Sequence, residues 1–378
     1  MSAGHQPSRG SAAQPQGTKL AVIAAGGTGG HMFPAQALAE ELLARGWQVR
    51  LSTDERGARY AGGFPKAVEV TTLQSATFAR GGILAKLMVP VRLMSGALSA
   101  RRQMKAQPPA MVIGFGGYPS IPALAAAWLL HLPRAIHEQN GVLGSVNRRF
   151  APKVDLVACG TWPTEVPAGV TAEHIGNPVR AAIKAKAASP YPGVAGRLEV
   201  LVLGGSQGAK ALSDHVPAAL TALPDGLKAR LSVSQQARPE DVDRVVAAYR
   251  AAGIAADVQS FFDDVPERMA RASLVIARAG ASTLADLTVI GRPSILVPYP
   301  FAASDHQTAN AKSLLAAGAA KLMPESALTA QALAEAVAEI LLDQDKAQAM
   351  AAAALALGKP EAAKDLADRV EILARKGS

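Results

Sequence analysis

Three short glycine-containing segments of this sequence have the composition of loops that bind phosphate groups. They are residues 26–30 (GGTGG), 204–208 (GGSQG) and 278–283 (RAGAST), and each follows an apolar run and precedes a helical pattern. Backbone N–H groups at a helix start can approach phosphate oxygens where glycine leaves room, and the helix dipole favours the negative charge. A glycine pair also permits a tight turn without any ligand. Three such loops in one chain favour a phosphate-bearing ligand.

Several familiar motifs do not fit these loops. The first loop is not GxGxxG, because Met32 occupies the third glycine position, and the second is not a Walker A loop, because Ala211 replaces Ser or Thr. Asp241 and Asp243 resemble the DxD metal motif of some sugar transferases. They follow Pro239 at an expected helix start, where acids complement the dipole, and side chains two residues apart diverge on a helix. We therefore expect no metal site and no cofactor.

A hydrolase is a rival interpretation of the second loop. Residues 204–208 match GxSxG, the nucleophile elbow of α/β-hydrolases, and Asp286 and His306 follow Ser206 in the chain order of that catalytic triad. The elbow fold has one domain, however, and leaves residues 26–30 unexplained. A serine hydroxyl also serves a phosphate as a hydrogen-bond donor. The hydrolase is therefore the less favoured alternative.

The elements that must position these loops alternate between apolar runs and helical patterns. Strands are expected at residues 19–25, 47–52, 110–114, 134–137, 199–203, 231–234, 273–277 and 294–297. Pro34 is expected in the first turn of a helix that ends near Gly46. This alternation predicts an α/β fold with parallel sheets covered on both faces. Because two of the glycine loops lie about one domain length apart, we expect two Rossmann-like domains with a ligand in the cleft between them.

The length of 378 residues also favours two domains. The expected divisions are a disordered tail (1–18), a first domain (19–180), a linker (181–197), a second domain (198–345) and C-terminal helices (346–378). The tail lacks the apolar core of a signal peptide. The single cysteine, Cys159, argues against disulfides and Cys-based metal sites, and no apolar run approaches the roughly 20 residues of a spanning helix.

Positive charge is concentrated in one part of the chain. Residues 70–137 contain no Asp or Glu, and they carry +7 of the net charge of +9 through Arg80, Lys86, Arg92, Arg101, Arg102, Lys105 and Arg134. Such a stretch suits nucleic acid, an anionic membrane or an acidic ligand. It lacks the interleaved aromatic residues on which bases would stack, so a nucleic-acid partner is not expected.

Seven motifs taken together, in this order, resemble the MurG glycosyltransferases. They are GGTGGH (26–31), GFGGYPS (114–120), HEQNGVLGSVNR (137–148), GNPVR (176–180), GGSQGA (204–209), RAGAST (278–283) and DHQTANA (305–311). The resemblance runs from about residue 19 to the C-terminus. It implies the GT-B fold, in which two Rossmann-like parallel-sheet domains face a cleft and the last helix crosses back to the first domain.

The resemblance also implies an activity. The family transfers N-acetylglucosamine (GlcNAc) with inversion from UDP-GlcNAc to the 4-hydroxyl of N-acetylmuramic acid (MurNAc). The acceptor is undecaprenyl-diphosphate-MurNAc-pentapeptide (lipid I), and the product is lipid II for peptidoglycan synthesis. The second interpretation is another GT-B enzyme that uses UDP-GlcNAc, such as a 2-epimerase or a lipid A disaccharide synthase.

By position, the resemblance implies a donor site in which the second domain binds UDP-GlcNAc and the first closes over it. The first-domain residues are Thr28, Gly29, Gly30 and Asn140. In the second domain, diphosphate contacts are implied for Ser206, Ala281, Ser282, Thr283, Leu284 and Ala285, uracil contacts for Arg180 and the backbone of Phe262, and sugar contacts for Gln307 and Asn310. Phe262 is also compatible with a core position, and Asn310 with a cap or a solvated helix residue.

Asp286 departs from the family, which usually has Glu at this position to bind the ribose hydroxyls. Asp is one methylene shorter, so the helix must sit closer or a water must bridge. The run from Thr283 to Asp286 also resembles a capping box, a motif that prefers Glu or Gln at its end. Ribose binding is favoured over the cap.

His31 is the candidate catalytic base. A histidine near its normal pKa of about 6.5 accepts a proton at neutral pH, and this one follows the first glycine loop. His137 and Glu138 are alternative bases, and His31 is also compatible with ordering the loop or touching the acceptor diphosphate. Departure of UDP would be eased by the helix dipole near Ala281 rather than by a metal.

Because the acceptor of this family carries a long lipid tail, the resemblance implies a peripheral membrane protein at the cytoplasmic face of the bacterial inner membrane. Residues 77–98 mix apolar and basic side chains in the manner of an interfacial patch, with Phe78, Arg80, Ile83, Lys86, Leu87 and Arg92 as its expected members. An ordinary amphipathic helix packed on its sheet has a similar composition. Proteins of the wall-synthesis machinery are further possible partners.

Overall fold

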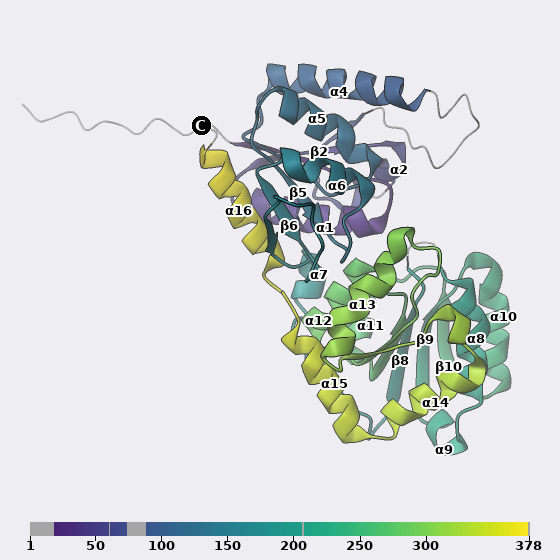
Figure 1. Cartoon of the computed structure of the whole chain (residues 1–378). Helices are drawn as coiled ribbons and strands as arrows, with labels where there is room; N and C mark the ends of the chain where they lie inside the picture. The colour runs from purple at the N-terminus through teal and green to yellow at the C-terminus, as the bar shows by residue number, and fades with distance from the viewer. Residues whose placement is uncertain (1–18, 60, 74–87, 206–207, 377–378) are drawn as a thin grey trace, which may run out of the picture.

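The computed structural model describes residues 19–59, 61–73, 88–205 and 208–376, and the structural statements below concern these residues. The chain forms two α/β units, each built on a parallel sheet with helices packed against it (Figure 1). The expected α/β fold with two parallel-sheet domains is confirmed. The expected tail, residues 1–18, lies outside the described residues.

The first domain contains a seven-stranded sheet in the order β3-β2-β1-β4-β5-β6-β7. Its strands are β1 (Leu20–Ala24), β2 (Gln48–Thr53), β3 (Glu69–Thr72), β4 (Met111–Gly114), β5 (Arg134–Glu138), β6 (Leu156–Cys159) and β7 (Ala172–His174). Its helices are α1 (Gly29–Ala44), α2 (Glu55–Ala58), α4 (Val89–Ala106), α5 (Ile121–Leu129) and α6 (Ser145–Phe150). From β1 the chain builds the sheet outward to β3, and it then returns to add β4 on the other side of β1. Doubly wound folds place their ligands at this switch point, which here lies between β1 and β4.

The second domain contains a six-stranded sheet in the order β10-β9-β8-β11-β12-β13. Its strands are β8 (Leu198–Leu203), β9 (Leu231–Gln236), β10 (Ala255–Gln259), β11 (Leu274–Ala277), β12 (Ser294–Leu296) and β13 (Ala320–Leu322). The helices of this half are α7 (Ala181–Lys184), α8 (Lys210–Thr221), α9 (Asp225–Lys228), α10 (Val242–Ala251), α11 (Val265–Arg271), α12 (Ala281–Ile290), α13 (His306–Ala316) and α14 (Ala330–Leu341). Its central order repeats that of the first sheet.

Each sheet is buried on both faces because side chains alternate along its central strand. In β1, Ala21 and Ile23 enter one apolar cluster, whereas Val22 and Ala24 enter the cluster on the other face. β8 divides its side chains between two clusters in the same way. Such strands read as continuous apolar runs, which is why both were visible in the sequence. The two sheets hold the loops at their carboxyl ends in fixed positions.

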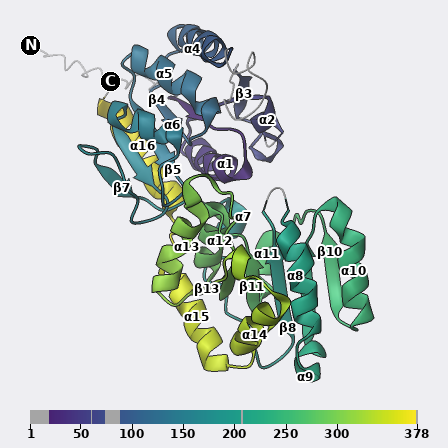
Figure 2. The same cartoon turned by 45° about the vertical axis from the view of Figure 1, so that its right-hand side comes forward.

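The C-terminal helices α15 (Gln344–Ala356) and α16 (Ala362–Lys376) belong to different halves of the molecule. α15 packs on α12, and α16 packs on α1 of the first domain. Leu366 and Val370 of α16 are fully buried in the first-domain core, and Arg45 binds Asp368 at 2.6 Å. Figures 1 and 2 both show α16 lying against the first domain, away from α14 and α15.

Three expectations about the elements need correction. The segment 181–197 is not a bare linker, because it begins with α7, whose Ile183 is fully buried in the second-domain core. Pro34 lies inside α1 rather than in its first turn, because the helix already begins at Gly29. The expected boundary at residue 345 also falls within α15. No described helix is both long and apolar enough to cross a membrane.

Candidate active site at the junction of the two domains

The first glycine loop connects β1 to α1, and its backbone is closely packed against neighbouring residues. A Cβ atom on Gly26 would lie 2.8 Å from Pro119, and Gly27 has a φ of +88°, so glycine is required at both positions. Thr28 is the N-cap residue, but its side chain makes no capping bond; its carbonyl accepts from the N–H groups of His31 and Met32. Thr28 and Gly30 are exposed, whereas Gly29 is buried. The loop therefore presents part of its backbone to solvent.

His31 is fixed in one orientation in the first turn of α1. Its Nδ1 lies 3.0 Å from the carbonyl oxygen of Gly26. Because a carbonyl only accepts, Nδ1 carries the proton and Nε2 has the free lone pair in the neutral ring. The ring lies against Gly116 and Gly117, on which a Cβ atom would come within 3.4 Å of it. The pKa of His31 is lowered, chiefly by burial, while the charge of Glu138 acts in the opposite direction.

Glu138 organises the loop that follows β5. Its Oε1 accepts from the backbone N–H of Asn140 at 3.1 Å and from Asn140 Nδ2 at 3.0 Å. Its Oε2 accepts from the N–H of Gly144 and from Asn147 Nδ2, both at 2.9 Å. The residue is 2% exposed. With four donors on two oxygens, the carboxylate is a scaffold, and the expectation that Glu138 is an alternative base is wrong.

His137 is also unsuited to the role of base. It is fully buried, its Nε2 lies 3.0 Å from the carbonyl of Gly176, and its Nδ1 lies 3.2 Å from Gln139 Nε2. Burial lowers the pKa of His137 to about 4. The ring therefore stays neutral and has both nitrogens engaged, which removes the second alternative base.

The N-terminus of α12 offers free backbone donors to a ligand. Its N-cap is Gly280, which has no side chain to cap the first turn, and the turn runs through Ala281, Ser282 and Thr283. The hydroxyl of Ser282 is buried and has no hydrogen-bond partner among the described residues. The first four N–H groups of a helix have no partner within the helix, so this end suits the expected diphosphate contacts. Leu284 is buried in the second-domain core, and Ala285 packs against it.

Asp286 lies one turn further along α12 and is not part of a capping box. Because the helix begins at Ala281, Thr283 is inside the helix and the capping interpretation is wrong. Burial raises the pKa of Asp286 to about 7, and the positive charge of Arg180 opposes this shift. The guanidinium of Arg180 lies 4.3 Å from the centre of the Phe33 ring of α1. Arg180 therefore stands between the two domains.

The loop after β5 and helix α13 join the two domains through amide hydrogen bonds. Asn310 Oδ1 accepts from the N–H of Gly141 at 2.8 Å, and Asn310 Nδ2 donates to Asn140 Oδ1 and to the carbonyl of Ala279, each at 3.1 Å. Asn310 is buried rather than solvated. Gln307 is half-buried, and its Oε1 accepts from the N–H of Tyr299 at 2.8 Å. Thus Asn140 and Asn310, expected from opposite domains, do lie together.

Other expected site residues have different surroundings. The side chain of Phe262 is 3% exposed and belongs to the second-domain core, with the guanidinium of Arg268 stacked on its ring at 4.0 Å. Arg92 is exposed on α4. The remaining expectations concern residues outside the described part of the chain: Ser206, Phe78, Arg80, Ile83, Lys86 and Leu87.

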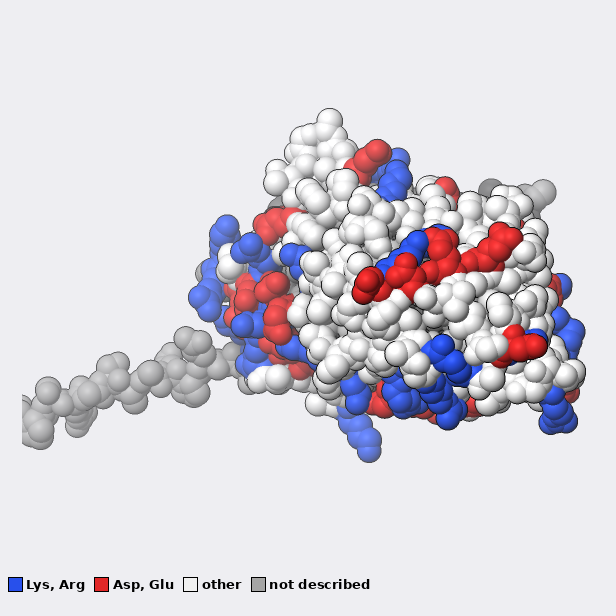
Figure 3. All heavy atoms as spheres, turned by 90° about the horizontal axis from the view of Figure 1, so that it is seen from below, with Lys and Arg blue, Asp and Glu red and all other residues white. Residues whose placement is uncertain are grey.

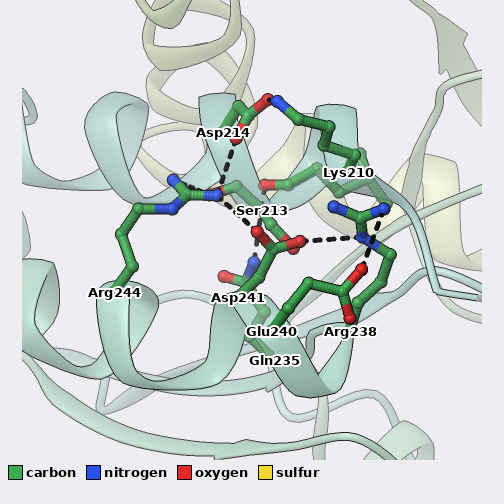
Figure 4. A network of polar contacts seen from close by, with 9 residues as sticks. Lys210, Ser213, Asp214, Gln235, Arg238, Glu240, Asp241 and Arg244 are labelled. Carbon is green, nitrogen blue, oxygen red and sulfur yellow. Dashed lines mark hydrogen bonds and ion pairs between the residues drawn. The ribbon is translucent and has the colours of Figure 1, made fainter.

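The pair Asp241 and Asp243 does not behave as a metal motif. Asp241 binds the guanidinium groups of Arg238 and Arg244, each at 2.9 Å, and Figure 4 shows it between them. Arg244 also binds Asp214 of α8 at 2.7 Å. This network ties α10 to α8. Among the described residues, no group of three or more His, Cys, Asp or Glu could hold a metal ion.

The sequence analysis gave three residues of the junction no role in a transferase site. Asn147 donates a hydrogen bond to Glu138, and the ring of Phe33 packs against the guanidinium of Arg180. The charge of His306 opposes protonation of His31. Asn147 and His306 lie within motifs that were quoted for other residues, so their polar side chains in a glycine-rich or helix-start context were the available signal. Nothing about Phe33 distinguishes it in the sequence from a core residue.

Comparison with known proteins identifies the family. The glycosyltransferase family 28 N-terminal domain matches residues 21–159, and the family 28 C-terminal domain matches residues 199–370. The UDP-N-acetylglucosamine–N-acetylmuramyl-(pentapeptide) pyrophosphoryl-undecaprenol N-acetylglucosamine transferase of Rhodospirillum centenum is 49% identical over 356 residues, which cover 92% of this chain and 93% of that protein. The protein of the same name from Caulobacter vibrioides is 47% identical, over 95% and 100% of the two chains.

Solved structures agree with this family, but other enzymes share the fold. The crystal structure of Acinetobacter baumannii MurG has a TM-score of 0.76 and 30% identity, and the match covers 94% of this chain and 99% of that one. A UDP-N-acetylglucosamine 2-epimerase from Listeria monocytogenes also matches, with a TM-score of 0.65, 14% identity and coverage of 95% and 97%. The second match shows only a shared fold, so the sequence identity along nearly the whole chain decides between them: this chain belongs to the MurG family of family 28 glycosyltransferases.

Proposed function

We propose that the enzyme transfers GlcNAc from UDP-GlcNAc to the 4-hydroxyl of MurNAc in lipid I, with inversion, and so forms lipid II for peptidoglycan. The observation that carries this proposal is the near-half identity with relatives named for this reaction, over more than nine tenths of the chain. The junction supports it chemically. Helix α1, which carries His31 in its first turn, contacts helix α12 of the other domain, and the N-terminus of α12 has no side-chain cap.

In the proposed reaction, residues 19–180 hold the acceptor and residues 198–345 hold the donor. His31 Nε2 takes the proton from the 4-hydroxyl as the oxygen attacks the anomeric carbon, and Nδ1–H remains bonded to Gly26. The bond from that carbon to the β-phosphate oxygen breaks, and UDP leaves. The N–H groups and dipole of α12 at residues 281–285, with the Ser282 hydroxyl, stabilise the developing phosphate charge.

The remaining donor contacts follow from position. We place Asp286 on the ribose hydroxyls, Arg180 and the Phe262 backbone at the uracil, and Gln307 at the sugar. Asn140 and Asn310 bind each other, so they reach the sugar only by exchanging that bond for one to a hydroxyl. Thr28, Gly29 and Gly30 supply backbone groups from the first domain, and Ser206 a hydroxyl from the second glycine loop.

The lipid acceptor suggests a peripheral position on the cytoplasmic face of the inner membrane. Support comes from α4, where Val91, Met94 and Leu98 are 57%, 63% and 46% exposed. Their spacing of three and four residues places them on one face of the helix. Exposed Arg92 and Arg102 lie on the same helix. An apolar stripe with basic neighbours suits an anionic membrane surface, where wall-synthesis proteins would also be met.

The test is to incubate the protein with UDP-GlcNAc and a lipid I analogue. We expect lipid-linked disaccharide and UDP in equal amounts. Release of UDP without disaccharide, or conversion of the sugar nucleotide without the lipid, would instead indicate a different GT-B enzyme. Ester hydrolysis that disappears in Ser206→Ala would revive the hydrolase alternative.

A further inference from the structure

Arg278 is the first residue of the third glycine loop and has no role in the reaction outlined above. It follows β11 directly and lies two residues before Gly280, the N-cap of α12. Its side chain is buried, with only 8% of the residue exposed. An arginine guanidinium stays charged in proteins, and a buried charge is costly unless it is paired. The partners of Arg278 therefore show which parts of the domain it holds in place.

The guanidinium of Arg278 joins the loop after β11 to the segments that follow β12 and β13. Its Nη1 donates to the carbonyl oxygens of Val297 and Pro298, at 3.2 and 3.1 Å. Its Nη2 lies 2.6 Å from a carboxylate oxygen of Glu325. The ring of Tyr299 covers the same group, with its centre 5.5 Å from the guanidinium carbon. One side chain thus fixes the backbone at the start of the segment between β12 and α13.

This segment between β12 and α13, residues 297–305, has little apolar packing of its own. Phe301 is 81% exposed and Tyr299 is 44% exposed. Ser304 and Asp305 have φ values of 54° and 49°, in the left-handed region that disfavours side chains other than glycine. Such a backbone persists only where surrounding structure fixes it, and Arg278 supplies a buried anchor for it.

The anchored segment in turn orients the two amide side chains of α13. The N–H of Tyr299 donates to Gln307 Oε1 at 2.8 Å, so the Nε2 end of that amide is left to donate to a ligand. Asn310 Nδ2 donates at 3.1 Å to the carbonyl oxygen of Ala279, the residue after Arg278. Both amides that the proposed reaction places near the donor sugar are therefore bonded to backbone that Arg278 holds or adjoins.

We propose that Arg278 is a positioning residue for recognition of the donor sugar: it anchors the backbone at residues 297–299 and thereby directs the Gln307 amide toward the GlcNAc ring. This inference rests on the proposed function, in which Gln307 contacts that sugar. Its physical basis is the planar guanidinium, which donates in fixed directions to two carbonyls and a carboxylate at once. The uracil and diphosphate contacts do not involve the anchored segment, so Arg278 acts on the sugar alone.

The test compares the affinities for UDP-GlcNAc and for UDP, which lacks the sugar, by calorimetry without an acceptor. The proteins are the wild type, Arg278→Gln, Gln307→Ala and the double variant. We expect the ratio of the Kd for UDP-GlcNAc to the Kd for UDP to rise about three- to tenfold in each single variant, while the Kd for UDP is unchanged. The double variant should show no further rise, because both changes remove the same contact.

Arg230→Gln is the matched control for the loss of a guanidinium. Arg230 also donates to backbone carbonyls, those of Val194 and Gly196, but it lies just before β9, at the end of the sheet opposite to Arg278. It should leave the ratio unchanged. If Arg278→Gln does not fold, Arg278→Lys takes its place, because it keeps the charge and loses the planar fork. The ratio should then rise by a smaller factor.

Two results would overturn the inference. Equal weakening of UDP and UDP-GlcNAc in Arg278→Gln would mean that Arg278 supports the whole donor site, and effects that add in the double variant would mean that it does not act through Gln307. Failure of the proposed function gives a different pattern: a wild type that binds neither nucleotide, or an unchanged ratio in Gln307→Ala. A ratio that changes in Gln307→Ala and not in Arg278→Gln removes this inference alone.

Discussion

The imidazole of His31 combines a fixed orientation with a pKa that favours the neutral form. One hydrogen bond, from Nδ1 to Gly26, sets the tautomer, and burial lowers the pKa. Loss of a positioned general base commonly costs about 10²–10⁴ in rate. We therefore expect His31→Ala to lower kcat by at least about a hundredfold with little change in the KM for UDP-GlcNAc. Steady-state kinetics with His215→Ala as control would check this, and a kcat within a few-fold of the wild type would remove His31 from the role.

Asp286 makes the free enzyme less stable as the pH rises. An aspartate in an unfolded chain titrates near about 4, whereas the pKa of Asp286 in the fold is about 7. Between these values the unfolded chain has released its proton while the folded protein still binds one, so the free energy of unfolding falls with rising pH. Relative to the wild type, Asp286→Asn should gain stability from about pH 4 to pH 7. Urea denaturation at a series of pH values measures the difference, and parallel curves would contradict it.

The same carboxyl should report on the donor. If it accepts hydrogen bonds from the ribose hydroxyls, binding favours its charged form, and the enzyme releases a proton near pH 7 when UDP-GlcNAc binds. Calorimetry in two buffers of different ionisation heat should show this release in the wild type and not in Asp286→Asn. The KM of the variant should rise about tenfold, and Asp286→Glu, which restores the usual family residue, should recover binding. An unchanged KM in Asp286→Asn would place the ribose elsewhere.

For single residues, the motifs predicted which residues share a site better than they predicted the hydrogen bonds and burial of each residue. The family resemblance implied that Asn140 and Asn310 belong to one site, and they do lie in contact. It did not indicate that Glu138 is saturated by four hydrogen bonds, because two of its donors come from residues six and nine positions away. Burial by segments distant in the chain also decides the pKa values of His137 and Asp286, and no local pattern records that burial.

At the scale of elements, the loop after β5 and helix α13 act as a contact that sets the distance between the domains. Gly141 is the tight point, since a Cβ atom there would lie 3.1 Å from the carbonyl oxygen of Ala309. Gly141→Ala should therefore push α13 away, weaken the Asn310 bonds and raise the KM for UDP-GlcNAc several-fold, while the melting temperature changes little. Gly226→Ala on α9 is the matched control, because nothing lies within 4 Å of its added carbon. A normal KM for Gly141→Ala would show that this contact is not needed for donor binding.

The elements that the sequence predicted best are the central strands. β1 and β8 are buried on both faces and therefore appear as apolar runs before glycine. The edge strands β3, β7, β10 and β13 were not predicted, because most of their side chains are exposed or half-buried and they form no continuous apolar run. An edge strand is defined by the neighbour that it pairs with, and that neighbour is distant in the chain. The strand β6 was also missed, although it is buried throughout.

At the scale of the whole molecule, charge is distributed unevenly between surfaces. Figure 3 shows acidic and basic side chains interspersed on the face seen from below. Helix α4 lies on the opposite side of the molecule in Figure 1 and contains four basic residues and no acidic one. The two substrates proposed here differ in the same way: the sugar nucleotide arrives from solution, and the acceptor is anchored in a lipid surface. The polarity of the molecule therefore matches a donor domain in solution and an acceptor domain at the membrane.

That match makes a prediction about α4. Val91, Met94 and Leu98 leave exposed apolar surface along one face of the helix, and burial of such side chains is worth about 25 cal/mol per Å². Met94→Ser with Leu98→Ser should weaken binding to vesicles containing phosphatidylglycerol about tenfold or more, and Arg92→Gln with Arg102→Gln should weaken it in a salt-dependent way. Leu342→Ser on the second domain is the matched control, because Leu342 is 65% exposed and follows directly on α14, which lies far from α4 in Figure 1. Vesicle co-sedimentation measures all three, and turnover of a water-soluble acceptor analogue should stay normal in each. If the α4 variants bind vesicles like the control, the membrane contact lies on another surface, and the charge asymmetry of the chain must be explained by the acceptor diphosphate alone.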